Sequence, residues 1–247
     1  MVVVIFATAG ARATDAAAQA PPGATRARAE VQIGLCAPAD HIVQALGLRA
    51  RGSPIEVWQF DDATLTLFAR GVRLRLRVAS DGRSVFTLKV AAQDCARLDR
   101  DRVPAGEGKC EYDVYATSTT GAMSLNVDLG EKQTSDLVAG RMTPAQALSP
   151  AQAGYLRDIV AIWPLPPGLR ALGPIEVRTY RDKSRKYDID ISQLRGGEKY
   201  AEISRKVPLA DADREMKIME GNLSRAGVDL CSDQSSQASN KLRALLR

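Results

Sequence analysis

Alternation of apolar and polar residues is the dominant pattern of the chain, and it predicts strands. The alternating segments are 30–35, 55–60, 72–78, 84–91, 109–117, 122–130, 175–180, 186–192 and 199–207. Since side chains point alternately to the two faces of a strand, each segment has one face suited to a core and one suited to polar surroundings. Asp81 and Gly82 mark a tight turn between two of these strands. The pattern therefore predicts a mostly antiparallel sheet.

A helical spacing of apolar residues appears in four other segments, at 39–48, 134–162, 211–226 and 235–246. Pro144 and Pro150 divide the longest of them, at positions suited to a break or to the first turn of a helix. We expect this part of the chain, 134–162, to form a helical insertion beside the sheet. Because 247 residues, 45% of them hydrophobic, can bury one good core, we expect a single domain over 30–247.

The first 29 residues differ from the rest in composition. An apolar run at 2–6 is followed by small residues and by two Ala-x-Ala sites, which end at Ala13 and Ala20. This is typical of a secretory signal with its cleavage region, and the stretch after it is typical of a linker. No basic residue precedes the apolar run, so a disordered Ala-rich leader is the alternative. We expect a periplasmic or secreted protein without a transmembrane segment, since no stretch reaches the ~20 apolar residues of a spanning helix.

Four cysteines fit the exported interpretation, because an even number can be used up in disulfides, although four residues allow three pairings. Cys95 and Cys110 flank a charged stretch between two predicted strands, so a bridge between them would close the base of a long hairpin. Cys36 and Cys231 would then pair by elimination. The alternative is four unrelated thiols, which would be ordinary in a cytosolic chain.

Charge and aromatic content narrow the class of partner. The 34 Lys and Arg exceed the 29 Asp and Glu, and this mildly positive balance favours anionic partners. Only six Tyr, four Phe and two Trp are available to stack on bases, and no zinc-finger or RNP-like motif is present. We therefore do not expect the protein to bind nucleic acid.

Three arginines alternate with leucines in the most informative strand. Arg73, Arg75 and Arg77 fall on one face of the 72–78 segment, and Leu74 and Leu76 fall on the other. Neighbours on one face lie about 6.8 Å apart, so each adjacent pair of arginines repels by roughly 2.4 kcal/mol at an effective dielectric constant of about 20. Something negative, or open solvent, must offset this repulsion. A solvated outer face of the sheet is the alternative to an anion site, and periodicity alone does not exclude it.

The next two strands add lysines and carboxylates. Thr87 and Lys89 share a face, and Lys109, Glu111 and Asp113 share another. Arg holds phosphate oxygens through paired hydrogen bonds, Lys supplies a point charge, and carboxylates hold the Mg²⁺ or Mn²⁺ that accompanies a polyphosphate. The set predicts a site for a phosphorylated anionic small molecule or polyphosphate, with an exposed ladder of salt bridges as the alternative.

The order of these residues resembles the CYTH family of triphosphate tunnel metalloenzymes. Asp61 and Gly71 keep the spacing between that family's Tyr/Phe-Asp-Thr segment and its glycine. Arg75, Arg77 and Lys89 fall on its Leu-Arg-x-Arg and Thr-x-Lys motifs. Conservative matches to its Arg-x-Glu-x-Glu motif, and less sharp matches beyond it, are Lys109, Glu111, Asp113, Arg178, Arg181, Asp188, Asp190, Glu202 and Lys241.

The resemblance implies an α+β fold built on a mostly antiparallel eight-stranded β-barrel with flanking helices. It also implies that the barrel binds triphosphate, and that Mg²⁺ or Mn²⁺ supports attack of water on a terminal phosphoryl group. The implied anion-binding residues are Arg73, Arg75, Arg77, Lys89, Lys109, Arg178, Arg181, Lys206 and Lys241. The implied metal ligands are Glu30, Glu111, Asp113, Asp188, Asp190 and Glu202.

Two motifs depart from the family pattern. The first strand of the family carries Glu-x-Glu-x-Lys, of which Glu30 keeps only the first position, with Gln32 and Gly34 at the others. A later Glu-x-Glu is reduced to Glu202 and Ser204. Since a neutral carbonyl binds a divalent cation more weakly than a carboxylate does, metal loading is weakened, while the basic set is largely kept apart from the cation that Gly34 removes. The alternative is a metal site rebuilt from Glu111, Asp113, Asp188 and Asp190. Three hypotheses follow: a metal-dependent triphosphatase, a non-catalytic receptor or envelope protein that captures a polyanion, and a structural protein whose tunnel charges pair among themselves.

Overall fold

The computed structural model describes residues 27–91, 94–95, 108–184, 186–234 and 237–247. Its strands are β1 (Arg28–Leu35), β2 (Arg49–Ala50), β3 (Ile55–Asp61), β4 (Val72–Ala79), β5 (Ser84–Ala91), β6 (Gly108–Tyr115), β7 (Ser118–Leu129), β8 (Arg170–Arg181), β9 (Asp188–Leu194) and β10 (Lys199–Pro208). Its helices are α1 (Ala39–Ala45), α2 (Thr66–Ala69), α3 (Glu131–Val138), α4 (Pro144–Ala147), α5 (Pro150–Asp158), the 3₁₀ turn η3 (Leu209–Asp211), α6 (Ala212–Arg225) and α7 (Gln237–Ala244). The expected signal segment lies within residues 1–26, outside the described residues.

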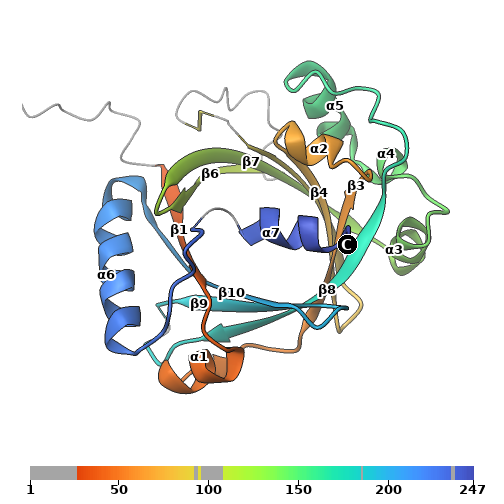
Figure 1. Cartoon of the computed structure of the whole chain (residues 1–247). Helices are drawn as coiled ribbons and strands as arrows, with labels where there is room; N and C mark the ends of the chain where they lie inside the picture. Colours follow the sequence, from red (N-terminus) through yellow and green to blue (C-terminus); the bar gives the residue numbers. More distant parts are fainter. Residues whose placement is uncertain (1–26, 92–93, 96–107, 185, 235–236) are drawn as a thin grey trace, which may run out of the picture.

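Nine of the described strands close into a barrel, which Figure 1 shows in a view along its opening. The order around it is β8-β3-β4-β5-β7-β6-β1-β10-β9, and β9 pairs back with β8. The pairings are antiparallel except for β1 with β6. The mostly antiparallel barrel with flanking helices is thus confirmed, but it has nine strands in place of the expected eight. The reason is that each of the nine alternating segments finds a partner on both sides, while the short β2 only extends β8.

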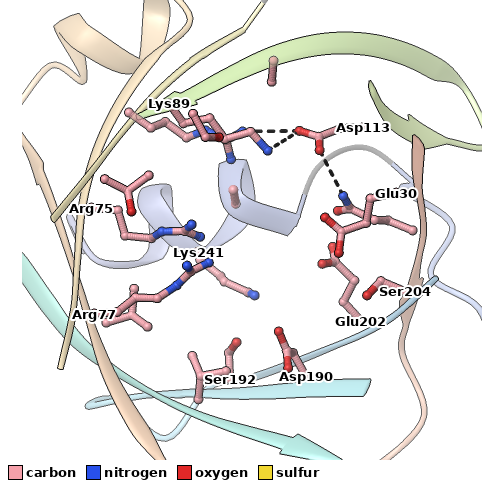
Figure 2. A pocket seen from close by; sticks show the side chains of 18 of the residues that line it. Glu30, Arg75, Arg77, Lys89, Asp113, Asp190, Ser192, Glu202, Ser204 and Lys241 are labelled. Atoms are coloured by element: carbon pink, nitrogen blue, oxygen red, sulfur yellow. Dashed lines mark hydrogen bonds and ion pairs between the residues drawn. The ribbon is translucent and has the colours of Figure 1, made fainter. Parts of the chain in front are cut away.

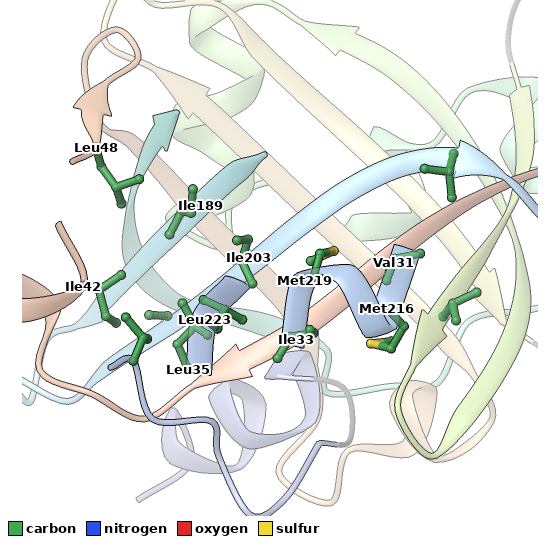
Figure 3. Packing of buried hydrophobic residues seen from close by; sticks show 14 of the residues in the cluster. Val31, Ile33, Leu35, Ile42, Leu48, Ile189, Ile203, Met216, Met219 and Leu223 are labelled. Carbon is green, nitrogen blue, oxygen red and sulfur yellow. The ribbon is translucent and has the colours of Figure 1, made fainter. Parts of the chain in front are cut away.

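The apolar faces of the strands point outward, and helices cover them. Over β1 and β10, the side chains of Met216, Met219 and Leu223 on α6 pack against Val31 and Ile203 (Figure 3). A second apolar cluster lies under α2, α3 and α5 on the outer face of β4, β5 and β7. Burial of a side chain of this size contributes about 2 kcal/mol. Most of the core therefore surrounds the barrel, and the interior is left to the polar faces of the strands except for an apolar stretch on β3 and β8.

The turn before β4 fixes how the arginines enter the barrel. Asp61, only 2% exposed, accepts hydrogen bonds at Oδ1 from the Leu67 amide (3.0 Å) and at Oδ2 from the Phe68 amide (2.9 Å). These bonds satisfy the second and third amides of α2, a helical turn within a segment that sequence reasoning treated only as a connection. Gly71 follows with φ +72°, which glycine adopts without a steric penalty. Asp61 thus holds the backbone ahead of the arginine strand and does not line the cavity.

The C-terminal segment returns to the barrel and places α7 across its opening (Figure 1). Cys231 is bonded to Cys36 just after β1. The amide of Gln234 accepts from the backbone N–H of Gly34 (2.9 Å) and donates to its carbonyl oxygen (3.0 Å). Beyond this anchor, the end of α7 packs inside the barrel against an apolar set that comprises Ile55, Val57, Ile175, Val177 and Leu194.

Both expected disulfides are confirmed, because Cys95 is bonded to Cys110 and Cys36 to Cys231. Each joins an end of a barrel strand to a segment outside the strand order: Cys110 lies in β6, and Cys36 directly follows β1. Among the described helices, none has the length and apolar character needed to cross a membrane.

Candidate functional site

The barrel encloses a cavity of about 560 Å³ whose walls differ in charge. The inward faces of β4 and β5 carry the basic wall, and Glu30, Asp190 and Glu202 on β1, β9 and β10 form the acidic wall opposite (Figure 2). Between them, an apolar stretch is formed by Ile55, Val57, Ile175 and Val177. The cavity is therefore large enough for a chain of phosphate groups and offers it a cationic side.

Arg73 and Lys89, on neighbouring positions of β4 and β5, are tied to a carboxylate. The Lys89 ammonium lies 2.5 Å from Asp113 Oδ2, and Arg73 Nη2 lies 3.7 Å from the same oxygen. Burial is the main cause that lowers the pKa of Lys89, with repulsion from Arg73 adding to it and Asp113 opposing it. These two cations are already neutralised in part by the chain itself.

Arg75 and Arg77 project into the cavity without such a partner. In the part of the chain that the structure describes, neither guanidinium has a hydrogen bond or ion pair to a side chain. Burial, followed by repulsion from Arg77 and Arg73, lowers the pKa of Arg75 well below its usual value. Burial is also the main cause that lowers the pKa of Arg77, although its side chain keeps access to solvent through the tunnel. Glu30 attracts both groups from a distance, but no carboxylate of the described residues lies in direct contact with either.

The acidic wall is centred on Glu202. Its strand pairs with β9 so that Glu202 lies directly opposite Asp190, and both side chains face the cavity. Burial, reinforced by the negative charges of Asp190, Glu30 and Asp113, raises the pKa of Glu202 to about 7, against the attraction of Lys241. Asp190 accepts a hydrogen bond from the Thr179 hydroxyl at 2.7 Å. At neutral pH this wall therefore holds a carboxyl group that gains or loses a proton readily.

Lys241 enters the cavity from α7 and points between the basic and acidic walls (Figure 2). Burial is the largest cause that lowers its pKa, while Glu202 and Asp190 act in the opposite direction. Its position depends on the anchor of the C-terminal segment on β1, through the Cys36–Cys231 disulfide and Gln234. Sequence reasoning singled out Lys241 and the two cysteines but did not connect them.

A third charged group lies where the cavity opens to solvent. The carboxylate of Glu111 accepts from Lys109 Nζ at 2.7 Å and from Lys206 Nζ at 2.9 Å. Burial raises the pKa of Glu111, but the hydrogen bonds from the two lysines outweigh it, so the net shift is downward. Both lysines line the cavity, yet each has about half of its side chain exposed, 53% for Lys109 and 40% for Lys206.

Three predicted site residues are not part of the cavity lining. Arg178 lies on the outer face of β8, since Val177 and Thr179 on either side face inward, and its guanidinium lies 3.6 Å from Glu176. Arg181 and Asp188 pair with each other at 2.8 Å beyond the lined region. The expectation that these three join the anion and metal sites is therefore corrected. Arg178 is absent from the cavity lining because the alternation of side chains along β8 places it on the outer face.

Sequence reasoning named Thr87 and Gln32 but missed their partners Asn126 and Tyr115, and it missed Ser192. Thr87 donates to Asn126 Oδ1 at 2.8 Å, and Tyr115 donates to Gln32 Oε1 at 2.8 Å. The hydroxyl of Ser192 faces the cavity, is fully buried, and has no hydrogen-bond partner among the described residues. The alternation of the strands carried the signal, because these positions share the inward parity of the charged residues.

The six expected metal ligands do not form a metal site. Glu111 is held by two lysines at the cavity mouth, Asp113 by Lys89 and Arg73, and Asp188 by Arg181 outside the lining. Among the described residues, which include all six, no three His, Cys, Asp or Glu side chains lie close enough together to hold a metal ion. A hard divalent cation needs several oxygen ligands at 2.0–2.6 Å. The donor set therefore does not fit Mg²⁺ or Mn²⁺.

Comparison with known proteins gives a clear answer for the fold. No protein-family model matches the chain, and no curated protein matches it. Among solved structures, a proposed adenylyl cyclase from Hippeastrum, described as having a dominant triphosphatase activity, aligns with a TM-score of 0.59 over 87% of this chain and 95% of its own, at 14% identity. A proposed adenylate cyclase from Bacillus halodurans aligns with a TM-score of 0.56 over 85% of this chain and 96% of its own, at 11% identity. The CYTH-type tunnel fold that the sequence resemblance implied is thus confirmed.

Proposed function

We propose that the tunnel binds an anion with several linked phosphate groups, such as inorganic triphosphate or a related phosphorylated compound. The observation that carries this proposal is the pair Arg75 and Arg77, which face an enclosed cavity without an ionic partner among the described residues. Two adjacent guanidinium groups in one enclosed space repel each other, and a multivalent anion removes that repulsion. Each guanidinium also offers a planar fork of donors that matches phosphate oxygens.

The other cations of the lining extend this cradle along the tunnel. Lys241 approaches from α7, Lys89 and Arg73 from the basic wall, and Lys109 and Lys206 from the mouth. A chain of phosphates is a better match for cations spread along a tunnel than a single compact anion is. The activity described for the Hippeastrum protein of similar fold supports the same class of ligand.

The site best supports a protein that binds the phosphorylated anion without hydrolysing it. A metal-dependent phosphoanhydride hydrolase, with Mg²⁺ or Mn²⁺ as its ion, is the second candidate, and the triphosphatase activity of the Hippeastrum protein favours it. The carboxylates weigh against it, because Gln32 replaces one acidic group and Asp113 and Glu111 are taken up by cations. Release of phosphate from tripolyphosphate, with and without these metal ions, separates the two candidates.

Export is part of the proposal. Two disulfides link β-strand ends to other segments, and such bonds persist in oxidising compartments. We infer that residues 1–29 serve as leader and linker and that 30–247 form one tunnel domain, with a periplasmic or secreted location. The ligand would then be a phosphorylated compound found outside the cytoplasm.

Calorimetric titration of tripolyphosphate into the purified protein tests the binding proposal. The double variant Arg75→Gln with Arg77→Gln should lose roughly 100-fold in affinity or more, since each charge-assisted bond contributes about 1.5–3 kcal/mol. Arg178→Gln is the matched control, because it removes an arginine from the outer face of the same barrel. Equal affinity in the double variant and the control would refute the proposal.

A further inference from the structure

Asp113 and Glu111, two of the five carboxylates that line the tunnel among the described residues, are each held by two cations of the chain itself. We propose that the tunnel takes up its phosphate-bearing ligand free of divalent cations, and that Lys241, Lys89 and Arg73 supply the positive charge that a metal ion would otherwise bring. This inference rests on the proposed function, since it concerns the form in which the same anion binds. It is carried by Asp113, Gln32 and the position of Lys241.

Both oxygens of Asp113 are already used. Oδ2 lies 2.5 Å from the Lys89 ammonium and 3.7 Å from Arg73 Nη2, and Oδ1 accepts from Gln32 Nε2 at 3.4 Å. The residue is only 6% exposed. A metal ion could reach this carboxylate only by displacing Lys89, which would leave a buried ammonium next to a divalent charge. Removing one partner from a buried ion pair is strongly unfavourable, so Asp113 is not available as a ligand.

Gln32 occupies the inward position of β1 between Glu30 and Gly34, and its side chain is fixed from both ends. Oε1 accepts from the Tyr115 hydroxyl at 2.8 Å, while Nε2 donates to Asp113. Reversing the amide would place its oxygen against the Asp113 carboxylate, where neither group can donate a hydrogen bond. The one atom of Gln32 that could bind a cation is therefore held in a hydrogen bond, with the NH₂ group facing the acidic neighbour.

Asp190 and Glu202 face an internal cation, Lys241, whereas the charge of Glu30 acts on Arg75, Arg77 and Lys206. Figure 2 shows Lys241 extending from α7 toward the space in front of Asp190 and Glu202. Its ammonium attracts both carboxylates, so one positive charge of the chain already lies in front of the acidic wall. The anchor of α7 on β1 makes this cation a fixed part of the site.

The balance of charge along the cavity agrees with this arrangement. Seven cationic and five acidic side chains line it among the described residues, which leaves an excess of two positive charges. A site with an excess of negative charge needs a metal ion before it can accept a polyanion, whereas this cavity attracts one directly. Divalent ions in solution bind polyphosphate themselves and lower its charge. They are therefore expected to compete with the tunnel rather than assist it.

Titration of tripolyphosphate into the full chain, in EDTA and then in excess Mg²⁺ or Mn²⁺, tests the inference. We expect equal or tighter binding in EDTA, and no saturable uptake of Mn²⁺ by the ligand-free protein in electron paramagnetic resonance. Affinity weaker in EDTA by about tenfold or more, or a saturable Mn²⁺ site, overturns the inference but leaves the proposed function intact. Absence of binding in both buffers overturns the proposed function and the inference with it.

A substitution that restores an acidic group sharpens the test. Gln32→Glu should lower the affinity in EDTA by about tenfold, because it adds a negative charge beside Asp113, and Mn²⁺ should recover part of the loss. Gln193→Glu is the matched control, since Gln193 is exposed on the outer face of β9. If Gln32→Glu binds tripolyphosphate in EDTA as the control does, position 32 does not govern metal dependence and the inference fails.

Discussion

The two faces of β4 are built on opposite principles. Its outward residues Leu74 and Leu76 are fully buried under α2 and the neighbouring helices, and they belong to a well-packed apolar cluster. Its inward residues Arg75 and Arg77 share an enclosed space with like charges and lack an ionic partner among the described residues. The outer face stabilises the barrel. The inner face holds positive charges that repel one another, and a bound anion can reduce that repulsion. Because side chains alternate between the two faces of β4, one strand can provide residues for stability on its outer face and residues for binding on its inner face.

The largest effect is expected on the outer face. Leu76→Ala should lower the free energy of unfolding by about 2–5 kcal/mol, because it leaves a cavity in a cluster with no solvent access. Urea denaturation followed by circular dichroism measures the change. The affinity of the folded variant for tripolyphosphate should stay close to that of the unchanged protein. A loss below about 1 kcal/mol would contradict the assignment of this face as core.

A smaller effect of opposite sign is expected on the inner face. Arg75→Gln should raise the free energy of unfolding of the ligand-free protein by about 1–2 kcal/mol, since it removes a buried charge that Arg73 and Arg77 repel. The same variant should bind tripolyphosphate more weakly, so its gain in stability is lost when the ligand is present. Thermal unfolding with and without the anion measures both changes, with Arg178→Gln as the control. A destabilised ligand-free Arg75→Gln would show that the tunnel charges are balanced internally.

The same contrast explains how much could be predicted from the sequence. Alternation fixed the faces of the strands, so the barrel, the disulfides and the inward direction of the arginines followed from local pattern together with the family resemblance. Arg178 was misplaced because the resemblance assigned it by motif, although its neighbours Val177 and Thr179 give it the outward parity. The strand count was taken from the family in the same way, while the nine alternating segments were visible in the chain.

What sequence could not predict depends on contacts between distant segments. The ion pairs of Asp113 join residues of β4, β5 and β6, and Gln32 meets Tyr115 across 83 positions. The anchoring of the C-terminal segment on Gly34 spans 200 positions. A local sequence pattern cannot predict these hydrogen-bond and ion-pair partners, since each depends on the register of the strands in the closed barrel. The tunnel's acids therefore looked like metal ligands by type, and only their partners show that most are already engaged.

The smallest effect is a dependence of binding on pH, which comes from the acidic wall. Glu202 has a pKa of about 7, raised by burial and by Asp190, Glu30 and Asp113 against the attraction of Lys241. Because this pKa lies above that of the unfolded chain, the protonated form favours the native state, and its contribution to stability is lost as pH rises through 7.

Ionisation of Glu202 also places a negative charge in the anion site. The affinity for tripolyphosphate in EDTA should therefore fall by roughly three- to tenfold as pH rises from about 6 to 8, after allowance for the anion's own titration. Glu202→Gln is the control for the titration of the anion itself, because its amide does not titrate and the same anion is used. Calorimetric titrations of both proteins across this range measure the difference. If the affinities of the two proteins changed with pH in parallel, Glu202 would keep one charge state throughout. The acidic wall would then have no pH-dependent effect on anion binding.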